Sequence, residues 1–395
     1  MTNAIQRDPD GTLRSGLHLL ARHDLGGHGD TMHVNVVNGI AYVGHQGDDR
    51  VGTSILDVSD PRHPELLAQI TTPPGTHSHK VQVVGDVLVV NHERNLLERD
   101  ATSWSAGIAI YDVSDPARPQ QISFLPTPGK GVHRMTYWAE PYIFITGSDN
   151  GYTDQLLIIA DLSDPSAPTE VGRWHLPGMH SAAGEIPDWA PGRVMKLHHA
   201  LVRGDRAYAG WWDGGLVILD VSDVRSPHLV SRLEFPAELS RATHTALPLP
   251  ERDLLVVTDE CVVAGPGRAD VEQRIRLVDI SDETAPAVVG QFPLLDPAFH
   301  DGPGRCGPHN LHEMRPGTFR SSRTVHATYF NAGLRVFDVD DPTNPVEIAS
   351  FVPPAAPGSA AIQFNDLTVT ADGLVYVTDR AGGGLYIVEP EIDFP

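Results

Sequence analysis

The sequence predicts an all-β protein, a single seven-bladed β-propeller over residues 1–395 with four-stranded antiparallel blades and an N-terminal closing strand. Three observations lead to this prediction. A short motif returns at intervals of 49 to 59 residues. Apolar residues alternate with polar or small ones between its copies, and a histidine stands near the start of most repeats. No long segment shows helical periodicity.

The repeated motif ends in an aspartate-rich turn. Ser-Ile-Leu-Asp-Val-Ser-Asp-Pro at 54–61 returns in five further copies, and a degenerate seventh copy ends near Glu389. The first aspartates of the six clear copies are Asp57, Asp112, Asp161, Asp220, Asp279 and Asp338. Because aspartate side chains cap tight turns, we expect these residues to form turns and not to act as catalytic acids.

Each repeat is expected to contain four short strands. In the first blade these are 33–37, 40–44, 53–58 and 65–71, with Asn-Gly and Asp-Pro pairs at the turns. The same reading places the seven blades at 33–71, 79–127, 133–176, 198–235, 244–294, 309–353 and 364–390. The last blade lacks an outer strand, which residues 17–24 are expected to supply. That closure would remove the open sheet edges of the ring.

The repeated segments resemble those of the LVIVD-repeat family of propeller proteins, in about seven copies over residues 33–390. This resemblance implies architecture more than chemistry. A fold-level comparison extends to two propeller enzyme families, selenium-binding protein/methanethiol oxidase and the carotenoid cleavage oxygenases. The latter hold iron by four histidines from separate blades, but no motif places this chain in either family.

Composition excludes several classes of partner. The chain has 51 acidic and 29 basic residues, for a formal charge of −22, which argues against binding to nucleic acid or to an anionic membrane. No stretch reaches the roughly 20 apolar residues of a membrane span. The N-terminal residues lack the apolar core of a signal peptide, and the two cysteines, Cys261 and Cys306, have no paired spacing. We therefore expect a cytoplasmic protein that acts on a small molecule.

Histidines near the starts of the inner strands predict a metal site on the propeller axis. Side chains repeated at the mouth of each blade converge on one axis, and imidazoles suit iron, copper, zinc, manganese or nickel. The alternative is that each histidine only bonds the neighbouring blade. The predicted ligand pool is His33, His79, His133, His199, His244, His309 and His312.

Strand register limits which of these histidines can be ligands. Side chains alternate between the faces of a strand, so we expect only one of His198 and His199 to point into the channel. The choice between His309 and His312 stays open. For the same reason His312 and Glu313 are not expected to be ligands together.

Three glutamates, Glu93, Glu260 and Glu313, are predicted to orient ligand histidines or to act as acid or base. Insertions at 94–106, 178–197, 262–272 and 296–311 are expected to build a pocket on the same rim. The predicted function is a metal-dependent enzyme with oxidative chemistry. The alternatives are a metal-assisted lyase, hydratase or hydrolase, and a non-catalytic propeller that binds a ligand or a protein.

Overall fold

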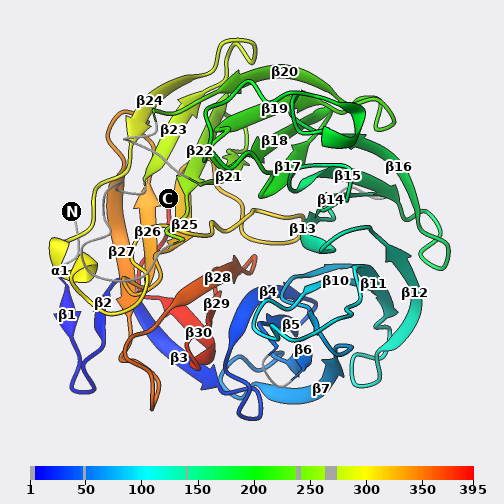
Figure 1. Cartoon of the computed structure of the whole chain (residues 1–395). Coiled ribbons are helices and arrows are strands. Elements are labelled where there is room, and N and C mark those ends of the chain that lie inside the picture. Colours follow the sequence, from blue (N-terminus) through cyan, green and yellow to red (C-terminus); the bar gives the residue numbers. More distant parts are fainter. Residues whose placement is uncertain (1–4, 48–49, 139–140, 237–241, 263–273) are drawn as a thin grey trace.

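Seven antiparallel sheets form a closed ring around a central axis (Figure 1). The computed structural model describes residues 5–47, 50–138, 141–236, 242–262 and 274–395. In these ranges the helices are one α-helix, α1 (Pro297–His300), and one 3₁₀ turn, η1 (Ser181–Ala183). None of the described helices is long and apolar enough to cross a membrane. The prediction of an all-β, seven-bladed propeller is confirmed.

The first four blades follow the predicted plan, with strands in chain order from the axis outward. Blade 1 is β4 (Thr31–Val37), β5 (Ile40–His45), β6 (Val51–Asp57) and β7 (Glu65–Thr71). Blade 2 is β8 (Thr76–His77), β9 (Val81–Val84), β10 (Val87–Arg94), β11 (Gly107–Asp112) and β12 (Gln120–Pro126). Blade 3 is β13 (Val132–Thr136), β14 (Tyr142–Gly147), β15 (Leu156–Asp161) and β16 (Thr169–Trp174). Blade 4 is β17 (His199–Arg203), β18 (Arg206–Gly210), β19 (Leu216–Asp220) and β20 (His228–Leu233).

The last three blades bring the two ends of the chain together. Blade 5 is β21 (Thr243–Pro248), β22 (Leu254–Asp259), β23 (Ile275–Asp279) and β24 (Ala287–Gln291). Blade 6 is β25 (Thr324–Thr328), β26 (Leu334–Asp338), β27 (Val346–Val352), β2 (Leu13–Ser15) and β1 (Gln6–Arg7). Blade 7 is β28 (Phe364–Val369), β29 (Val375–Asp379), β30 (Gly384–Pro390) and β3 (Leu17–His23).

The N-terminal segment closes the ring, as predicted. Strand β3 pairs antiparallel with β30, from Leu17 opposite Pro390 to His23 opposite Leu385. The segment before it, for which the sequence predicted no strand, also pairs: β2 pairs with β27 and adds the β1–β2 hairpin to blade 6. One N-terminal stretch therefore pairs with the outer edges of two neighbouring blades. The backbone N–H and C=O groups of β27 and β30 that it pairs are no longer exposed.

The inner strand of blade 6 is irregular. Residues 309–312 pair with β25 through an isolated bridge between Leu311 and Ala327 and three backbone hydrogen bonds of 2.9 to 3.0 Å. The chain then leaves the ladder at Met314, whose φ of 52° is left-handed. Pro316 follows and cannot donate to a ladder. The predicted inner strand is present here as a bridged segment.

Local turn chemistry and apolar alternation account for the blades. In every clear copy of the motif the first aspartate accepts a hydrogen bond of 2.7 to 2.9 Å from the amide two residues later, which confirms its turn role. Seven buried apolar clusters fill the seven gaps between neighbouring blades. The ring is therefore held by burial between blades, and the polar axis contributes little of that area.

Candidate metal centre

The inner strands begin with a bulge that places two successive side chains on the axis. The register slips by one residue at Thr31/His33, Val132/Arg134, Thr243/Thr245 and Phe364/Asp366. A bulge inserts one extra residue and re-aims its side chain. The extra position carries His133 and His244, and the corresponding residues of blades 2, 4 and 6 are His79, His198 and His309. We call these five residues the histidine ring.

The histidine ring is continuous around five successive blades. Ring centroids are 5.0 Å apart from His79 to His133, 5.3 Å from His133 to His198, 3.5 Å from His198 to His244, and 4.6 Å from His244 to His309. Burial lowers the pKa of four members well below the usual value, namely His79, His198, His244 and His309. These imidazoles are therefore neutral at pH 7 and keep a lone pair for a metal ion.

Glycines at the ends of second strands let the blades approach the ring. A Cβ atom on Gly44 would lie 2.6 Å from the carbonyl oxygen of His79, and one on Gly210 would overlap the carbonyl of His244 in the same way. Any larger residue would push the next blade away. The two glycines thus set the position of ring histidines in neighbouring blades.

Hydrogen bonds at Nδ1 orient three histidines of the ring. His198 Nδ1 donates to the carbonyl oxygen of His244 at 3.1 Å, His309 Nδ1 donates to that of Asn365 at 2.6 Å, and His244 Nδ1 contacts the Thr245 hydroxyl at 2.9 Å. A donor at Nδ1 leaves the lone pair on Nε2. The Nε2 atom of His244 is buried and has no hydrogen-bond partner among the described residues. In metal-binding histidines a hydrogen bond at one imidazole nitrogen orients the other toward the ion, as it would here.

Glu260 faces these Nε2 atoms. Its carboxylate oxygens lie 3.9 Å from His244 Nε2 and 3.6 Å from His309 Nε2. Ligand atoms of His198, His244 and Glu260 lie within 4.8 Å of one another, and Arg305 Nη1 lies 3.1 Å from the same carboxylate. Two histidines with one carboxylate are typical of non-haem iron(II) centres, and imidazole also suits copper and zinc. The described residues can therefore hold a divalent ion at Glu260.

Glu93 occupies another side of the ring. It accepts hydrogen bonds from His77 Nε2 at 3.1 Å and from His133 Nδ1 at 3.0 Å. Burial opposes ionisation of Glu93, but the charges and hydrogen bonds of His133 and His77 outweigh it and hold its pKa below the usual range. His77, His79 and Glu93 form a further group with metal-ligand spacing. Sequence reasoning missed His77, although the alternating pair His77 and His79 could have indicated it.

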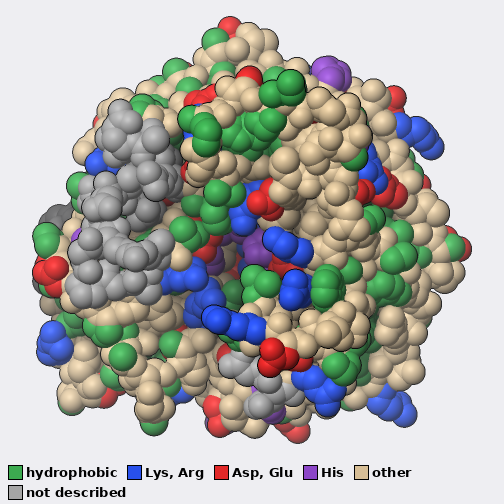
Figure 2. Space-filling model, viewed as in Figure 1, with side chains coloured by type: hydrophobic (Ala, Val, Ile, Leu, Met, Phe, Trp, Pro, Cys, Tyr) green, Lys and Arg blue, Asp and Glu red, His purple; other side chains and the backbone are tan. Residues whose placement is uncertain are grey.

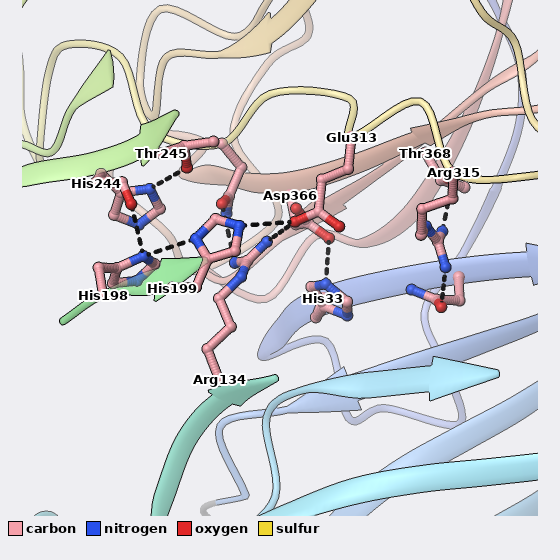
Figure 3. Close-up of polar contacts among 12 residues, drawn as sticks. His33, Arg134, His198, His199, His244, Thr245, Glu313, Arg315, Asp366 and Thr368 are labelled. Atoms are coloured by element: carbon pink, nitrogen blue, oxygen red, sulfur yellow. Dashed lines mark hydrogen bonds and ion pairs between the residues drawn. The ribbon is translucent and has the colours of Figure 1, made fainter. Parts of the chain in front are cut away.

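A buried ionic layer lies next to the histidine ring (Figure 3). Its members His33, Arg134, His199 and Asp366 come from the start of inner strands, and Glu313 comes from the segment after His312. Glu313 accepts a hydrogen bond from Arg134, and His199 Nε2 lies 3.2 Å from the same carboxylate. His33 Nε2 lies 3.5 Å from Asp366 Oδ2. Burial opposes ionisation of Glu313, but Arg134 holds its pKa well below the usual range. These contacts fill the channel beside the ring.

The expectation that only one of His198 and His199 reaches the axis is wrong. His198 stacks on His244 in the ring, while His199 contacts Glu313 in the ionic layer, and both are buried. The alternation argument fails because the paired ladder of this blade begins at His199, opposite Gly210, and His198 lies before it. His33 also lies in the ionic layer, where its Nδ1 accepts a hydrogen bond from Val81 N at 3.3 Å.

His312 lies apart from the histidine ring. Its Nε2 donates to the Phe319 carbonyl at 2.8 Å, and its Nδ1 accepts from Val369 N at 3.2 Å. Both imidazole nitrogens are therefore occupied, Nε2 within blade 6 and Nδ1 by β28 of blade 7. Of His309 and His312, it is therefore His309 that lies at the axis. Glu313, on the opposite side of the strand from His312, also faces the axis.

The histidine ring is open to one face of the propeller. Figure 2 shows histidine side chains at the bottom of a central hollow on this face, with Lys and Arg side chains around it. The predicted insertion at 178–197 lies on this rim, where Lys196 Nζ stands 3.7 Å above the Trp212 ring. The insertion at 262–272 lies almost entirely outside the described residues.

Comparisons with known proteins agree with this architecture. The LVIVD repeat matches residues 28–72, 140–175, 199–234 and 269–293. No curated protein sequence matches the chain.

Solved structures with similar folds share little sequence with the chain. A chain of the mitotic checkpoint complex aligns with a TM-score of 0.58 at 13% identity, covering 94% of this chain and 92% of that one. The Cps50 (Swd1) β-propeller domain of Myceliophteria thermophila gives 0.56 at 11%, covering 95% and 99%. The computationally designed Ika8 protein gives 0.52 at 8%, covering 93% and 98%. At these identities the likeness shows the fold alone. The chain contains LVIVD repeats and is a seven-bladed β-propeller.

Proposed function

We propose that this propeller is a metal-dependent enzyme whose ion is bound at the axis by His198, His244, His309 and Glu260. The observation that supports this most is the unpartnered, buried Nε2 of His244, which faces a carboxylate oxygen at 3.9 Å. Leaving a buried polar atom unpaired costs about 1–3 kcal/mol. An ion at this position would use that atom.

The surrounding residues have distinct roles in this proposal. The Thr245 hydroxyl and the backbone carbonyls of His244 and Asn365 orient the three imidazoles. Arg305 holds Glu260 in place through its 3.1 Å contact. The ionic layer keeps water from crossing the channel, so substrate reaches the ion from the open face. The ion would supply a Lewis acid and, as iron or copper, a redox centre.

Oxidative chemistry on a small organic substrate is the reaction class that we propose first, because the donor set combines neutral imidazoles with one carboxylate. Glu93 favours a second candidate, a lyase, hydratase or hydrolase. Its carboxylate accepts a hydrogen bond from Nδ1 of the half-buried His133, so the His133 imidazole could accept a proton at Nε2 while Glu93 stabilises the imidazolium. Metal identity separates the two, since zinc supports only the second. The cytoplasmic location remains a prediction.

Elemental analysis of protein purified without a histidine tag tests the proposal. We expect close to one equivalent of iron or copper in the parent and a loss of most of it in His244→Ala. His228→Ala is the matched control, because that histidine is exposed on the outer strand β20. Substrate oxidation that stops without oxygen would support the oxidative class. A parent that stays metal-free after exposure to iron, copper, zinc and manganese would contradict the proposal and favour a non-catalytic binding propeller.

A further inference from the structure

The mouth of the axial channel is positively charged although the protein carries a formal charge of −22. Figure 2 shows Lys and Arg side chains gathered around the central hollow. Arg305 and Arg380 lie beside the histidine ring, because Arg305 contacts Glu260 and Arg380 donates to Asn365, whose carbonyl binds His309. A cleft lined by one sign of charge concentrates ligands of the opposite sign.

Arg380 is bound only by neutral groups in the contacts that the structure describes. Its Nη1 donates to Asn365 Oδ1 and its Nη2 to Gln46 Oε1, both at 3.3 Å. Burial and the nearby charge of Arg305 lower the pKa of Arg380 to about 10, so the guanidinium stays charged at pH 7. A groove of about 340 Å³ lined by His28, Asp30 and Arg380 gives it access to solvent.

Arg305 lies close to Arg380 and also to the candidate metal ligands. Gln363 holds both backbones, because its side-chain oxygen accepts from Arg305 N at 2.9 Å and its carbonyl accepts from Arg380 N at 3.1 Å. The Arg305 guanidinium lies 5.5 Å from the Phe330 ring, and Phe330 stacks on His309 at 4.6 Å. The two arginines thus stand next to the imidazole that faces Glu260.

The charges at this corner of the mouth do not balance. Glu260 is the carboxylate whose charge acts on Arg380, and it already contacts Arg305 at 3.1 Å. Asp30 lines the same groove but is bound by Gly47 N and His45 Nδ1, so Glu260 is the carboxylate that the two guanidinium groups share, and a divalent ion would add further positive charge. An anionic ligand would restore the balance, and the planar guanidinium suits an oxyanion because it can donate two parallel hydrogen bonds.

We propose that the substrate of the axial centre is a small organic anion, whose carboxylate or phosphate is bound by Arg380 and Arg305. That the anion is a substrate rests on the proposed function. The anion-binding site itself depends only on the two arginines. The anionic group would lie over Arg380, and the rest of the molecule would extend along Phe330 toward His309 and Glu260. Neutral molecules of the same size would bind poorly.

Isothermal titration calorimetry of the full-length, metal-loaded protein tests this site. Succinate and inorganic phosphate are the two anionic probes, and succinamide is the neutral one. We expect at least one anion to bind, succinamide not to bind, and Arg380→Gln to weaken anion binding at least about tenfold. Arg118→Gln, on an exposed arginine paired with Asp115, should bind as the parent does. The probe that binds identifies the anionic group.

Metal analysis of the same samples separates this proposal from the proposed function. Arg380→Gln should keep the parent's metal content and melting temperature, because Arg380 is not among the proposed ligands. If that variant does not fold, Arg380→Lys is the alternative. It keeps the positive charge but loses the two parallel donors of the guanidinium, so it should still bind anions, more weakly than the parent. Equal binding of succinate by parent and Arg380→Gln, or binding of neither anion by the parent, would overturn the inference. Anion binding by a parent that takes up no metal would support the anion site while contradicting the metal centre.

Discussion

Replacing Glu313 with glutamine should destabilise the propeller without removing the ion. Glu313 and Arg134 form an ion pair in which the two side chains are 7% and 1% exposed, and His199 Nε2 lies 3.2 Å from the same carboxylate. Removing one partner of a buried ion pair leaves the other charge uncompensated and costs about 3–5 kcal/mol. For 395 residues, an unfolding entropy of about 2.1 cal/mol/K per residue converts this into a fall in Tm of roughly 4–6 °C.

Thermal unfolding of four proteins measures this contribution. The set is the parent, Glu313→Gln, Arg134→Met and the double variant, each with its metal content determined. Because the double variant buries no uncompensated charge from this pair, it should melt closer to the parent than either single variant does. Glu313→Gln should keep most of its metal. A Tm for Glu313→Gln within about 1 °C of the parent would refute the argument, and complete loss of metal would make Glu313 a ligand.

Three further outcomes follow from the structure. Deleting residues 1–25 removes β1, β2 and β3, so the variant should aggregate or melt far below the parent, and unchanged melting and solubility would count against closure by this segment. His312→Ala should lower Tm and keep the metal, whereas His309→Ala should lose metal and keep the fold; metal loss in the first variant would place His312 at the ion. In metal-free protein, stability should fall as pH drops below about 6.5, because burial lowers the folded pKa of His312 to about 4 and the unfolded chain then binds the proton. By pH 5 the loss of unfolding free energy that comes from this histidine is about 2 kcal/mol. Equal Tm values at pH 7.5 and pH 5 would contradict this prediction.

The blades could be predicted because they depend on local interactions. Asp57 and its five counterparts each bond an amide two residues away, so the turn is encoded in the motif itself. Alternation of apolar residues then determines which face of each strand is buried. The closing strand at 17–24 was predicted on the same basis, since the seventh repeat lacked one strand. The β1–β2 hairpin had no repeat to reveal it.

The arrangement of residues at the propeller axis could be predicted only in part. Histidine type and repeat position indicated the ring, but alternation could not place both His198 and His199, because His198 lies before the ladder that begins at His199 opposite Gly210. His312 and Glu313 were correctly expected on opposite sides of their strand. Which of the two faces the axis depended on Phe319 and Val369, whose backbone groups occupy both nitrogens of His312.

By itself, the sequence determined the fold class, the number of blades and the residue types that line the axis, because turns and strand periodicity are local properties. The tertiary structure alone decided which of those residues meet. Glu313 and Arg134 are 179 residues apart, and the Val34 amide bonds Asp366 across 332. Such contacts exist only after the ring closes, since the angle and register of seven packed blades set the distances across the axis. The charge imbalance at Arg380 also depends on closure of the ring, because only closure brings Arg305 and Glu260 beside Arg380.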